Sequence, residues 1–153
     1  MTTPAPTTDA LPRIGCDVVD IDRLADRMRR RPTMLARLFT QREIEDALRG
    51  GVDPQSPTVA ARLAARFAAK EATRKALGDL RLPFHATEVR TGPDGAPRLY
   101  LHGAPACGAV TLSHDGGVAM AVVVVPADGD PRAPRQTTRM PAPTPVQGHH
   151  HAA

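Results

Sequence analysis

The sequence predicts a fold that combines helices and strands, organised around one long helix. Residues 58–78 (TVAARLAARFAAKEATRKALG) consist almost entirely of good helix formers. Two strongly β-prone runs, RIGCDVV at 13–19 and VAMAVVVV at 118–125, lie far from it on either side. The Pro-Asp-Gly sequence at 93–95 separates two shorter strand-like runs, as expected for a hairpin. The chain is therefore expected to form both kinds of element.

A chain of 153 residues is long enough for one domain with its own hydrophobic core. We place this domain at residues 13–125. Residues 1–12 are rich in Thr and Pro, and residues 126–153 are richer still in Pro, with few aliphatic side chains in either segment. Such segments cannot bury enough apolar surface to offset the entropy lost on ordering, so we expect both ends to be disordered.

Composition narrows the classes of partner. The formal net charge is +4, but aromatic residues make up only 3% of the chain and Trp is absent. This argues against a protein that stacks nucleic-acid bases, and it favours a ligand or partner rich in phosphate or carboxylate. No apolar run reaches the length of a membrane helix and no signal peptide is recognisable, so we expect a cytoplasmic protein. Cys16 and Cys107 are accordingly predicted to be buried thiols rather than a disulfide.

The run at 13–19 predicts a buried strand, because Ile14, Cys16 and two valines are apolar. Asp17 interrupts it, and a carboxylate inside such a strand is costly unless it is paired or binds a cation. Two interpretations of Asp17 stay open. It faces solvent from a sheet edge or caps a turn, or it is a metal ligand held on a rigid strand.

Residues 20–31 predict a helix with Asp20 or Asp22 as its N-cap and with Pro32 just beyond its end. Its apolar residues share one face at 100° per residue. Nearly opposite lie three arginines: Arg23, Arg27 and Arg30. Such a row is often only a solvated surface, but arginines in register also suit docking against an acidic helical partner.

Two more helices are expected. Thr40 and Glu43 have the spacing of a capping box, which predicts a helix to about residue 49. The helix at 58–78 has a capping residue before it and a glycine at its end, with a stripe of Val59, Leu63 and Phe67. In its second half, Glu71 and Lys75 are four residues apart and share a face. They form either an ordinary surface ion pair or part of a site for a metal and phosphate.

Four strands are expected in the rest of the domain, at 86–90, 98–101, 109–113 and 118–125. His114 follows the third of them and precedes a turn at the Gly-Gly sequence of 116–117. It is either an exposed turn residue or a histidine that faces an anion from the end of a strand.

Three stretches stand in an order and at separations typical of one enzyme family: IGCDVVDI, ARFAAKEATRKALG and TLSHDGGVAMAVVV. The FTQRE run from Phe39 to Glu43 and the DGAPRL hairpin match the same family. Over residues 13–125 the chain resembles 4′-phosphopantetheinyl transferases of the holo-[acyl-carrier-protein] synthase type. The resemblance implies an α+β fold with a long central helix packed on a small, mostly antiparallel sheet.

The resemblance also implies an activity, the transfer of 4′-phosphopantetheine from coenzyme A to a serine of an apo acyl carrier protein. Adenosine 3′,5′-bisphosphate is released, and Mg²⁺ is required. Carried over by position, Asp17 and Glu71 match the two Mg²⁺-binding carboxylates, and Lys75 matches the lysine that holds the coenzyme A phosphates. Arg66 and His114 match residues near the adenosine phosphates. The acceptor of the serine proton is Glu71 or a metal-bound water, an alternative that stays open.

For the partners, the resemblance implies that Arg23, and with it Arg27, contacts the acidic carrier protein. Small members of the family are trimers with active sites between subunits, so His114 would serve a neighbour's site. The carrier could belong to a fatty acid, polyketide or peptide synthase. Two rival functions are a non-catalytic binding module for an acidic protein and a nucleic-acid binder suggested by the pI of about 9.8. Acids interleaved among the basic residues and the missing aromatics argue against the latter.

Overall fold

The structure is a computed structural model that describes residues 11–127, and the predicted disordered ends lie almost wholly outside this range. Its helices are α1 (Ile21–Arg30), α2 (Thr33–Leu38), α3 (Gln41–Ala47) and α4 (Pro57–Leu77), with a short 3₁₀ turn, η2 (Phe84–Ala86). Its strands are β1 (Arg13–Asp20), β2 (Thr87–Thr91), β3 (Pro97–Leu101), β4 (Ala104–Pro105), β5 (Ala109–Asp115) and β6 (Val118–Val125). No helix in this part of the chain is long and apolar enough to span a bilayer.

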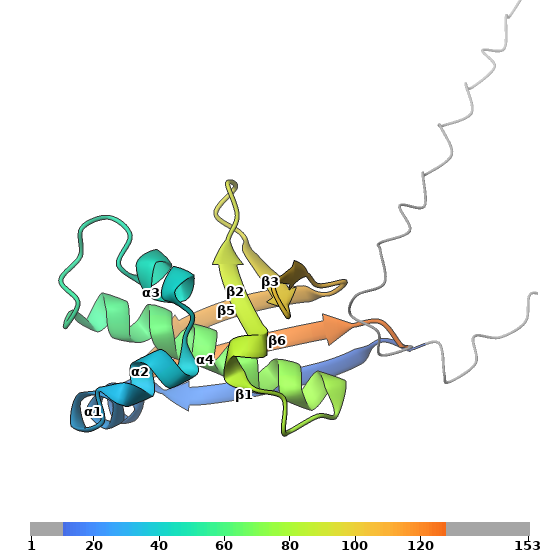
Figure 1. The fold of residues 1–153 in the computed structure, drawn as a ribbon, viewed down its shortest axis with the longest axis horizontal. Helices are drawn as coiled ribbons and strands as arrows, with labels where there is room; N and C mark the ends of the chain where they lie inside the picture. The colour runs from blue at the N-terminus through green and yellow to red at the C-terminus, as the bar shows by residue number, and fades with distance from the viewer. Residues whose placement is uncertain (1–10, 128–153) are drawn as a thin grey trace, which may run out of the picture.

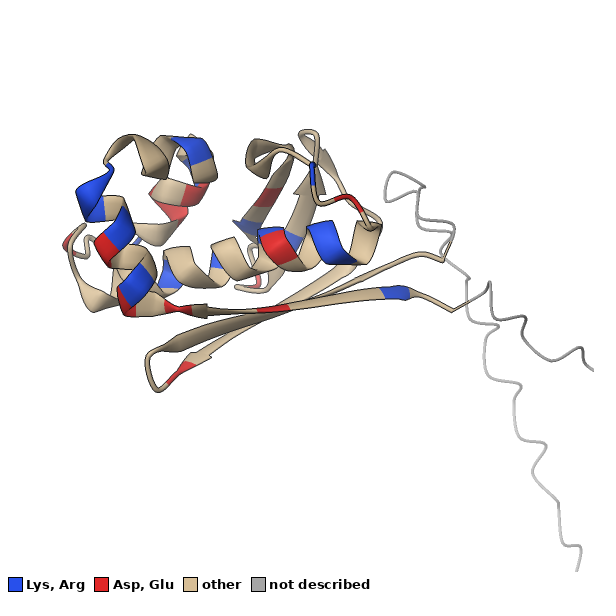
Figure 2. Ribbon diagram, turned by 90° about the horizontal axis from the view of Figure 1, so that it is seen from below, with Lys and Arg blue, Asp and Glu red and all other residues tan. Residues whose placement is uncertain are grey.

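The strands form two antiparallel sheets, one in the order β1-β6-β5 and one in the order β2-β3-β4 (Figure 1). Helix α4 lies along one face of the first sheet, and the other helices and the second sheet stand on that same side (Figure 2). The predicted α+β fold, with a long helix on an antiparallel sheet, is confirmed. The division of the strands into two sheets was not predicted.

The long helix begins and ends as its sequence predicts. The Ser56 side chain accepts a hydrogen bond from the Val59 N–H at 3.3 Å, and Gly78 ends the helix in the left-handed conformation at φ 68°. The buried surface is wider than the predicted stripe of apolar residues, because alanines fill most of the remaining turns. Seven of them are at most 8% exposed: Ala61, Ala64, Ala65, Ala68, Ala69, Ala72 and Ala76. Small side chains let neighbouring backbones approach the helix closely.

Strand β1 uses this close approach. A Cβ atom added to Gly15 would lie 1.9 Å from the Ala72 carbonyl oxygen, so only glycine fits at this position. The prediction of a fully buried strand is wrong. Ile14 and Val18 are 63% and 58% exposed, because α4 covers one face of the sheet and the alternating side chains of β1 turn to the other.

The prediction of two buried thiols is also wrong. Cys16 lies on the open face of the sheet and is exposed, and Cys107 is half-buried. Both cysteines are free.

Strand β6 is the central strand of the first sheet, and its apolar run alternates between two environments. Ala119, Ala121, Val123 and Val125 are at most 1% exposed beneath α4. On the opposite face, Val118 and Met120 are 44% and 40% exposed. A run without polar residues is expected to be covered on both faces, and the described chain covers only one.

The smaller elements follow their local signals with three differences. Asp20 caps α1, and Thr40 and Glu43 form the predicted capping box of α3. Helix α2 was not predicted, because Pro32 was interpreted only as a stop, whereas it stands at the N-cap of the next helix. Strand β4 was also not predicted. Strand β5 continues to Asp115, since a two-residue Gly-Gly turn is enough to connect it to β6.

Candidate active site

Asp17 and Lys75 form the centre of the first group of predicted site residues. Asp17 lies on the face of β1 that meets α4, and its side chain is only 18% exposed. Lys75 Nζ lies 2.7 Å from Asp17 Oδ1, and it also donates to the Cys16 carbonyl oxygen at 3.0 Å. Asp17 is therefore neither a turn cap nor a solvent-facing edge residue. It is a partly buried carboxylate that is paired with a cation.

Glu71 stands one helical turn before Lys75, but it pairs with a different cation. Its nearest ion-pair partner is Arg74, at 3.5 Å, so the simple Glu71–Lys75 surface pair considered from the sequence is not the pair that forms. The pKa of Lys75 is raised above its ordinary value by the hydrogen bond from Lys75 to Asp17 and then by the negative charges of Asp17 and Glu71. The Lys75 ammonium group is thus close enough to both carboxylates for their charges to act on its pKa. We call Asp17, Glu71 and Lys75 the carboxylate site.

This arrangement fits a divalent cation. Two carboxylates from different elements act on one positive charge, and hard cations such as Mg²⁺ prefer carboxylate oxygens, often using only one or two from the protein. Among residues 11–127, no group of three or more His, Cys, Asp or Glu side chains is arranged to hold a metal. A cation at Asp17 and Glu71 would therefore take its remaining ligands from water or substrate.

The second group of site residues surrounds a cavity of about 450 Å³ between α3, α4, β2 and β5. Its charged and titratable lining residues are Asp46, Arg49, Arg62, Arg66 and His114. We call this the arginine cavity. Arg66 and His114 were predicted as site residues, and the structure brings them together here.

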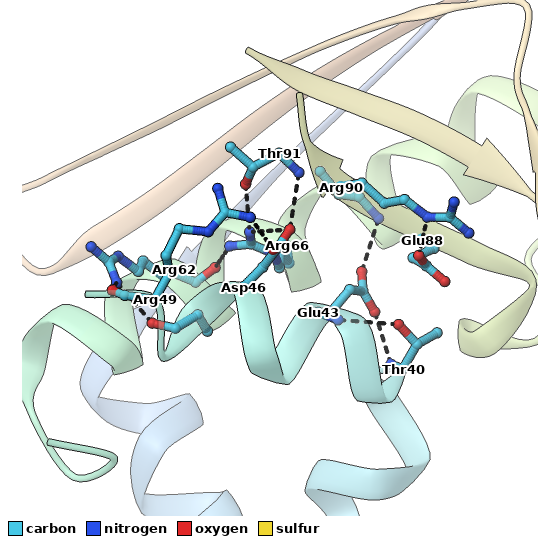
Figure 3. Close-up of polar contacts among 11 residues, drawn as sticks. Thr40, Glu43, Asp46, Arg49, Arg62, Arg66, Glu88, Arg90 and Thr91 are labelled. Atoms are coloured by element: carbon cyan, nitrogen blue, oxygen red, sulfur yellow. Dashed lines mark hydrogen bonds and ion pairs between the residues drawn. The ribbon is translucent and has the colours of Figure 1, made fainter. Parts of the chain in front are cut away.

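Arg66 is the deeply buried member of the arginine cavity, at 6% exposure. It donates to the Arg62 carbonyl oxygen at 3.1 Å and to Thr91 Oγ1 at 3.3 Å, and it lies 3.7 Å from Asp46 Oδ2 (Figure 3). Within the described residues its Nε has no hydrogen-bond partner. Burial lowers the pKa of Arg66 from its ordinary value, against the opposing pull of Asp46 and Glu43. A buried guanidinium with an unused donor is suited to an anion.

Three residues of the arginine cavity were missed by sequence reasoning. Arg62 donates to the Ala47 and Arg49 carbonyl oxygens at 2.9 and 2.8 Å, which satisfies the C-terminal end of α3. Asp46 connects α3 to β2 through the Thr91 N–H at 3.0 Å. The available sequence signals were the four-residue spacing of Arg62 and Arg66 and the three-residue spacing of Asp46 and Arg49.

A buried ion pair between Glu43 and Lys70 was also missed. Both side chains are 0% exposed, and their charged atoms lie 2.8 Å apart. Glu43 also accepts from the Val89 N–H at 3.0 Å and from the Thr40 N–H at 2.9 Å (Figure 3). Burial lowers the pKa of Lys70, and the charge of Glu43 opposes that shift. This pair joins α3, α4 and β2 beside the arginine cavity, and the sequence explained Glu43 only as part of a cap.

Residues 13–123 match the family model described as the 4'-phosphopantetheinyl transferase superfamily. The chain belongs to this superfamily. It is 45% identical over 121 residues to holo-[acyl-carrier-protein] synthases of Frankia casuarinae and Salinispora arenicola, which covers 72% of this chain and 93% and 94% of theirs.

Solved structures of the superfamily agree with this assignment. The Helicobacter pylori holo-[acyl-carrier-protein] synthase in complex with coenzyme A has a TM-score of 0.60 at 29% identity, covering 73% of this chain and 98% of that one. An ACPS–coenzyme A complex of Chronobacterium ammoniagenes has a TM-score of 0.63 at 25% identity, covering 76% and 97%.

The carboxylate site and the arginine cavity of this transferase-superfamily chain lie on different sides of α4. Arg66 and Lys75 are nine residues apart, which places them roughly 180° apart around the helix axis, and Arg66 and Glu71 are roughly 140° apart. The predicted site residues are therefore not gathered at one place within a single chain. They form two groups that share the helix.

The predicted partner-binding residues occupy a third place. Arg23 and Arg27 are exposed on α1. Asp26 pairs with the nearby Arg30 at 2.9 Å and with Arg29 at 3.4 Å, whereas Arg23 and Arg27 make no ion pair within residues 11–127. These two arginines are thus available to a partner.

Proposed function

We propose that this protein transfers the 4′-phosphopantetheine group of coenzyme A to a serine of an apo acyl carrier protein and releases adenosine 3′,5′-bisphosphate. The observation that carries the proposal is the carboxylate site, in which Asp17 pairs with Lys75 at 2.7 Å and Glu71 stands one helical turn before Lys75, in a chain of this superfamily. The names of relatives 45% identical to it, holo-[acyl-carrier-protein] synthases, support the choice of substrates.

In this reaction a bond forms between the serine oxygen and the phosphorus of phosphopantetheine. The bond from that phosphorus to the bridging oxygen of the pyrophosphate breaks, and the serine hydroxyl loses its proton. We assign Asp17 and Glu71 to hold Mg²⁺, which when bound would neutralise charge on the pyrophosphate and the leaving group. Lys75 would exchange its contact with Asp17 for the coenzyme A phosphates.

The charge state of Lys75 bears on the proton. Its raised pKa keeps Lys75 an ammonium at neutral pH, so it can bind phosphate but cannot accept the serine proton. Among the residues of the carboxylate site, this leaves a carboxylate, and we assign Glu71. Glu71 is preferred to Asp17 because its ion pair is the looser one: Glu71 lies 3.5 Å from Arg74, whereas Asp17 lies 2.7 Å from Lys75.

We assign Arg66 and His114 to the adenosine phosphates of coenzyme A. An anion in the arginine cavity could bind to Arg66 from α4 and to His114 from β5. The exposed Arg49 also lines this cavity. Because this cavity faces away from the carboxylate site, one chain does not present both to one coenzyme A molecule.

We therefore propose a homotrimer in which Asp17, Glu71 and Lys75 come from one chain and His114 comes from the next. Arg66 lines the same cavity as His114, so both residues would come from the same chain. The uncovered face of the first sheet supports the assembly, since four of its apolar side chains are 40% to 63% exposed: Ile14, Val18, Val118 and Met120. Closed cyclic symmetry would repeat the same composite site at each interface.

We propose that Arg23 and Arg27 dock the acidic carrier protein. Exposed charges at the rim of an interface act mainly on the association rate and its salt dependence. Arg23→Glu is therefore expected to raise KM for the carrier about tenfold or more while leaving KM for coenzyme A unchanged. Equal changes in both KM values would contradict this docking surface.

The proposed function is tested by following adenosine 3′,5′-bisphosphate release from coenzyme A with a panel of apo carrier proteins. Activity should require Mg²⁺ and be lost on chelation. Asp17→Asn and Glu71→Gln should each lower kcat by about a hundredfold or more while thermal unfolding stays near that of the wild type. Matched controls are Asp53→Asn and Glu45→Gln, which remove exposed carboxylates elsewhere. A protein that binds carriers tightly without turnover would instead be a binding module.

A further inference from the structure

Asp46 occupies an unusual position in the arginine cavity. It is the one carboxylate among the described residues that line it, and its side chain is only 11% exposed. Its Oδ1 lies 2.5 Å from Arg49 Nη2. Its Oδ2 accepts from the Thr91 N–H at 3.0 Å and lies 3.7 Å from Arg66 Nη2. Each oxygen of this carboxylate therefore faces a different arginine (Figure 3).

The charge on Asp46 is held in place by its surroundings. Burial tends to raise the pKa of Asp46, but the hydrogen bond from Thr91 and the positive charges of Arg49 and Arg66 outweigh it, so the pKa lies below the ordinary value. The carboxylate is ionised at neutral pH. Its backbone bond to β2 fixes where the negative charge sits.

Arg49 depends on this carboxylate for its place. The Arg49 side chain is 59% exposed, and Asp46 is its one ion-pair partner within residues 11–127. A long exposed arginine without a partner spreads over many rotamers, and ordering it on a ligand costs entropy. Asp46 restricts Arg49 to the wall of the cavity before any ligand arrives.

Arg66 lines the same cavity from helix α4, whereas Arg49 lines it from the turn that follows α3. It is nearly fully buried, its guanidinium is held by α4 and β2, and its Nε has no partner within the described residues. Two guanidinium groups held at separate walls match a phosphate monoester, which carries up to two negative charges and three acceptor oxygens. On the proposed function, the substrate carries one such group, the 3′-phosphate of coenzyme A.

We propose that Asp46 is a positioning residue that holds Arg49 and Arg66 for a phosphate monoester, and that Arg49 and Arg66 select coenzyme A over 3′-dephospho-coenzyme A. The proposal rests on the function proposed above and adds to it the two residues Asp46 and Arg49.

Steady-state kinetics with the two donors test the selection. The wild type should prefer coenzyme A in kcat/KM by about tenfold or more, because a buried site built for a charged group rejects a substrate that lacks it. Arg49→Gln should raise KM for coenzyme A by about tenfold, leave kcat unchanged, and leave KM for the dephospho form unchanged. Asp46→Asn should do the same, and Asp46→Glu should recover part of the preference.

Arg42→Gln is the matched control, because Arg42 is an exposed arginine of α3, the helix that carries Asp46, and does not line the cavity. It should behave as the wild type with both donors. A purely structural role for Asp46 would change both donors alike, whereas a positioning role changes their ratio. Since Arg49 is exposed, Arg49→Gln decides the question even where Asp46→Asn unfolds.

A second readout needs no turnover. Calorimetry should show adenosine 3′,5′-bisphosphate binding about tenfold more tightly than adenosine 5′-monophosphate to the wild type, with the difference reduced in Arg49→Gln. An unchanged difference in Arg49→Gln, or a wild type that does not discriminate, would overturn the inference. A wild type that discriminates in binding but transfers nothing from either donor would overturn the proposed function and leave the inference standing.

Discussion

The carboxylate site and the arginine cavity share helix α4 but are held in place by different forces. At the carboxylate site, β1 packs directly against the backbone of α4, with no room for even one Cβ atom at Gly15. At the arginine cavity, buried charges connect the elements, with Asp46 bound to Thr91 and Glu43 paired with Lys70. The chain has two lysines, one in each region. The side chain of Lys70, beside the arginine cavity, is 0% exposed, and that of Lys75, at the carboxylate site, is 48% exposed.

This comparison teaches that the two regions are sensitive to different substitutions. A region placed by close backbone packing tolerates changes of exposed charge but not added volume. A region placed by buried ion pairs tolerates small changes in volume but not the loss of one charge. The strongest test of the division asks whether the two regions also work in different chains.

Complementation gives the largest expected effect. On the proposed function, Glu71→Gln disables the carboxylate site and His114→Ala disables the arginine cavity, so each variant alone should be nearly inactive. After subunit exchange, some interfaces receive both intact residues, and part of the wild-type activity should return. Activity of the mixture is compared with each variant alone. No recovery despite proven exchange, or a fully active monomer in sedimentation, would place both regions in one chain's site.

Lys70→Met gives the next largest effect, a loss of folding stability. The substitution keeps the length of the side chain but leaves Glu43 buried without its cation. Two backbone carbonyls, those of Phe84 and Thr87, also lose their bonds to Lys70. The free energy of unfolding should fall by about 3–5 kcal/mol, measured by chemical denaturation.

Lys75→Met is the matched control for Lys70→Met, since it removes a lysine from the same helix at the exposed site. Its effect on the unfolding free energy should stay within about 1 kcal/mol. A double variant that also carries Glu43→Gln should lose less than the sum of the single losses, because the buried charge is removed with its partner. A Lys70→Met protein as stable as the Lys75→Met protein would contradict the contrast.

Gly15→Ala tests the packing of the carboxylate site. The added Cβ would lie 1.9 Å from the Ala72 carbonyl oxygen, and backbone atoms cannot give way as a side chain can. Strand β1 must therefore move away from α4, at a cost of about 2–3 kcal/mol in unfolding free energy. The shift should also carry Asp17 away from Lys75 and lower activity beyond the loss of stability.

Gly103→Ala is the comparison for this substitution, because Gly103 does not line the arginine cavity. Gly103 has a φ of 82°, but nothing lies within 4 Å of its added Cβ, so only the conformational strain of about 1–2 kcal/mol applies. Activity at a temperature where both variants are folded separates the two cases. Equal activity of Gly15→Ala and Gly103→Ala would show that β1 packing does not set the carboxylate site.

The same division explains what could be predicted from the sequence. Caps and periodicity located α1, α3 and α4 closely. The side chains of Asp20, Thr40 and Ser56 each accept a hydrogen bond from the first turn of the helix that they precede, so the signal is local in sequence. The cost of a carboxylate in a strand and the four-residue spacing on the helix singled out Asp17, Glu71 and Lys75 as candidates, and the resemblance suggested their roles. Local signals could not show that Glu43 pairs with Lys70, since that contact joins residues 27 positions apart through tertiary packing.

The error on β1 has a physical cause of the same kind. Apolar residues at Ile14 and Val18 indicate burial, but no element among residues 11–127 covers this face of the sheet. Asp46 was missed because an aspartate three residues before an arginine is common on exposed helices. Its importance comes from Thr91 and Arg66, which reach it from other elements.

The smallest expected effect is a difference in pH dependence between the two regions. Asp46 has a folded pKa below its ordinary value, so its contribution to stability is present above the unfolded value of about 3.9 and is lost as the pH falls through the folded pKa. Lys75 has a folded pKa above its ordinary value. Its contribution is present below the unfolded value of about 10.4 and is lost as the pH rises through the folded pKa.

Unfolding free energies of the wild type, Asp46→Asn and Lys75→Met across the pH range measure these contributions. The difference between the wild type and Asp46→Asn should be constant near neutral pH and shrink in acid below about pH 4. The difference for Lys75→Met should be present at neutral pH and shrink as the pH rises through the folded pKa of Lys75 in alkali. Because Lys75 is half-exposed and screened by solvent, its difference should be below about 1 kcal/mol. Two differences that shrink over the same pH range would mean that one coupled network, rather than two separately held regions, surrounds α4.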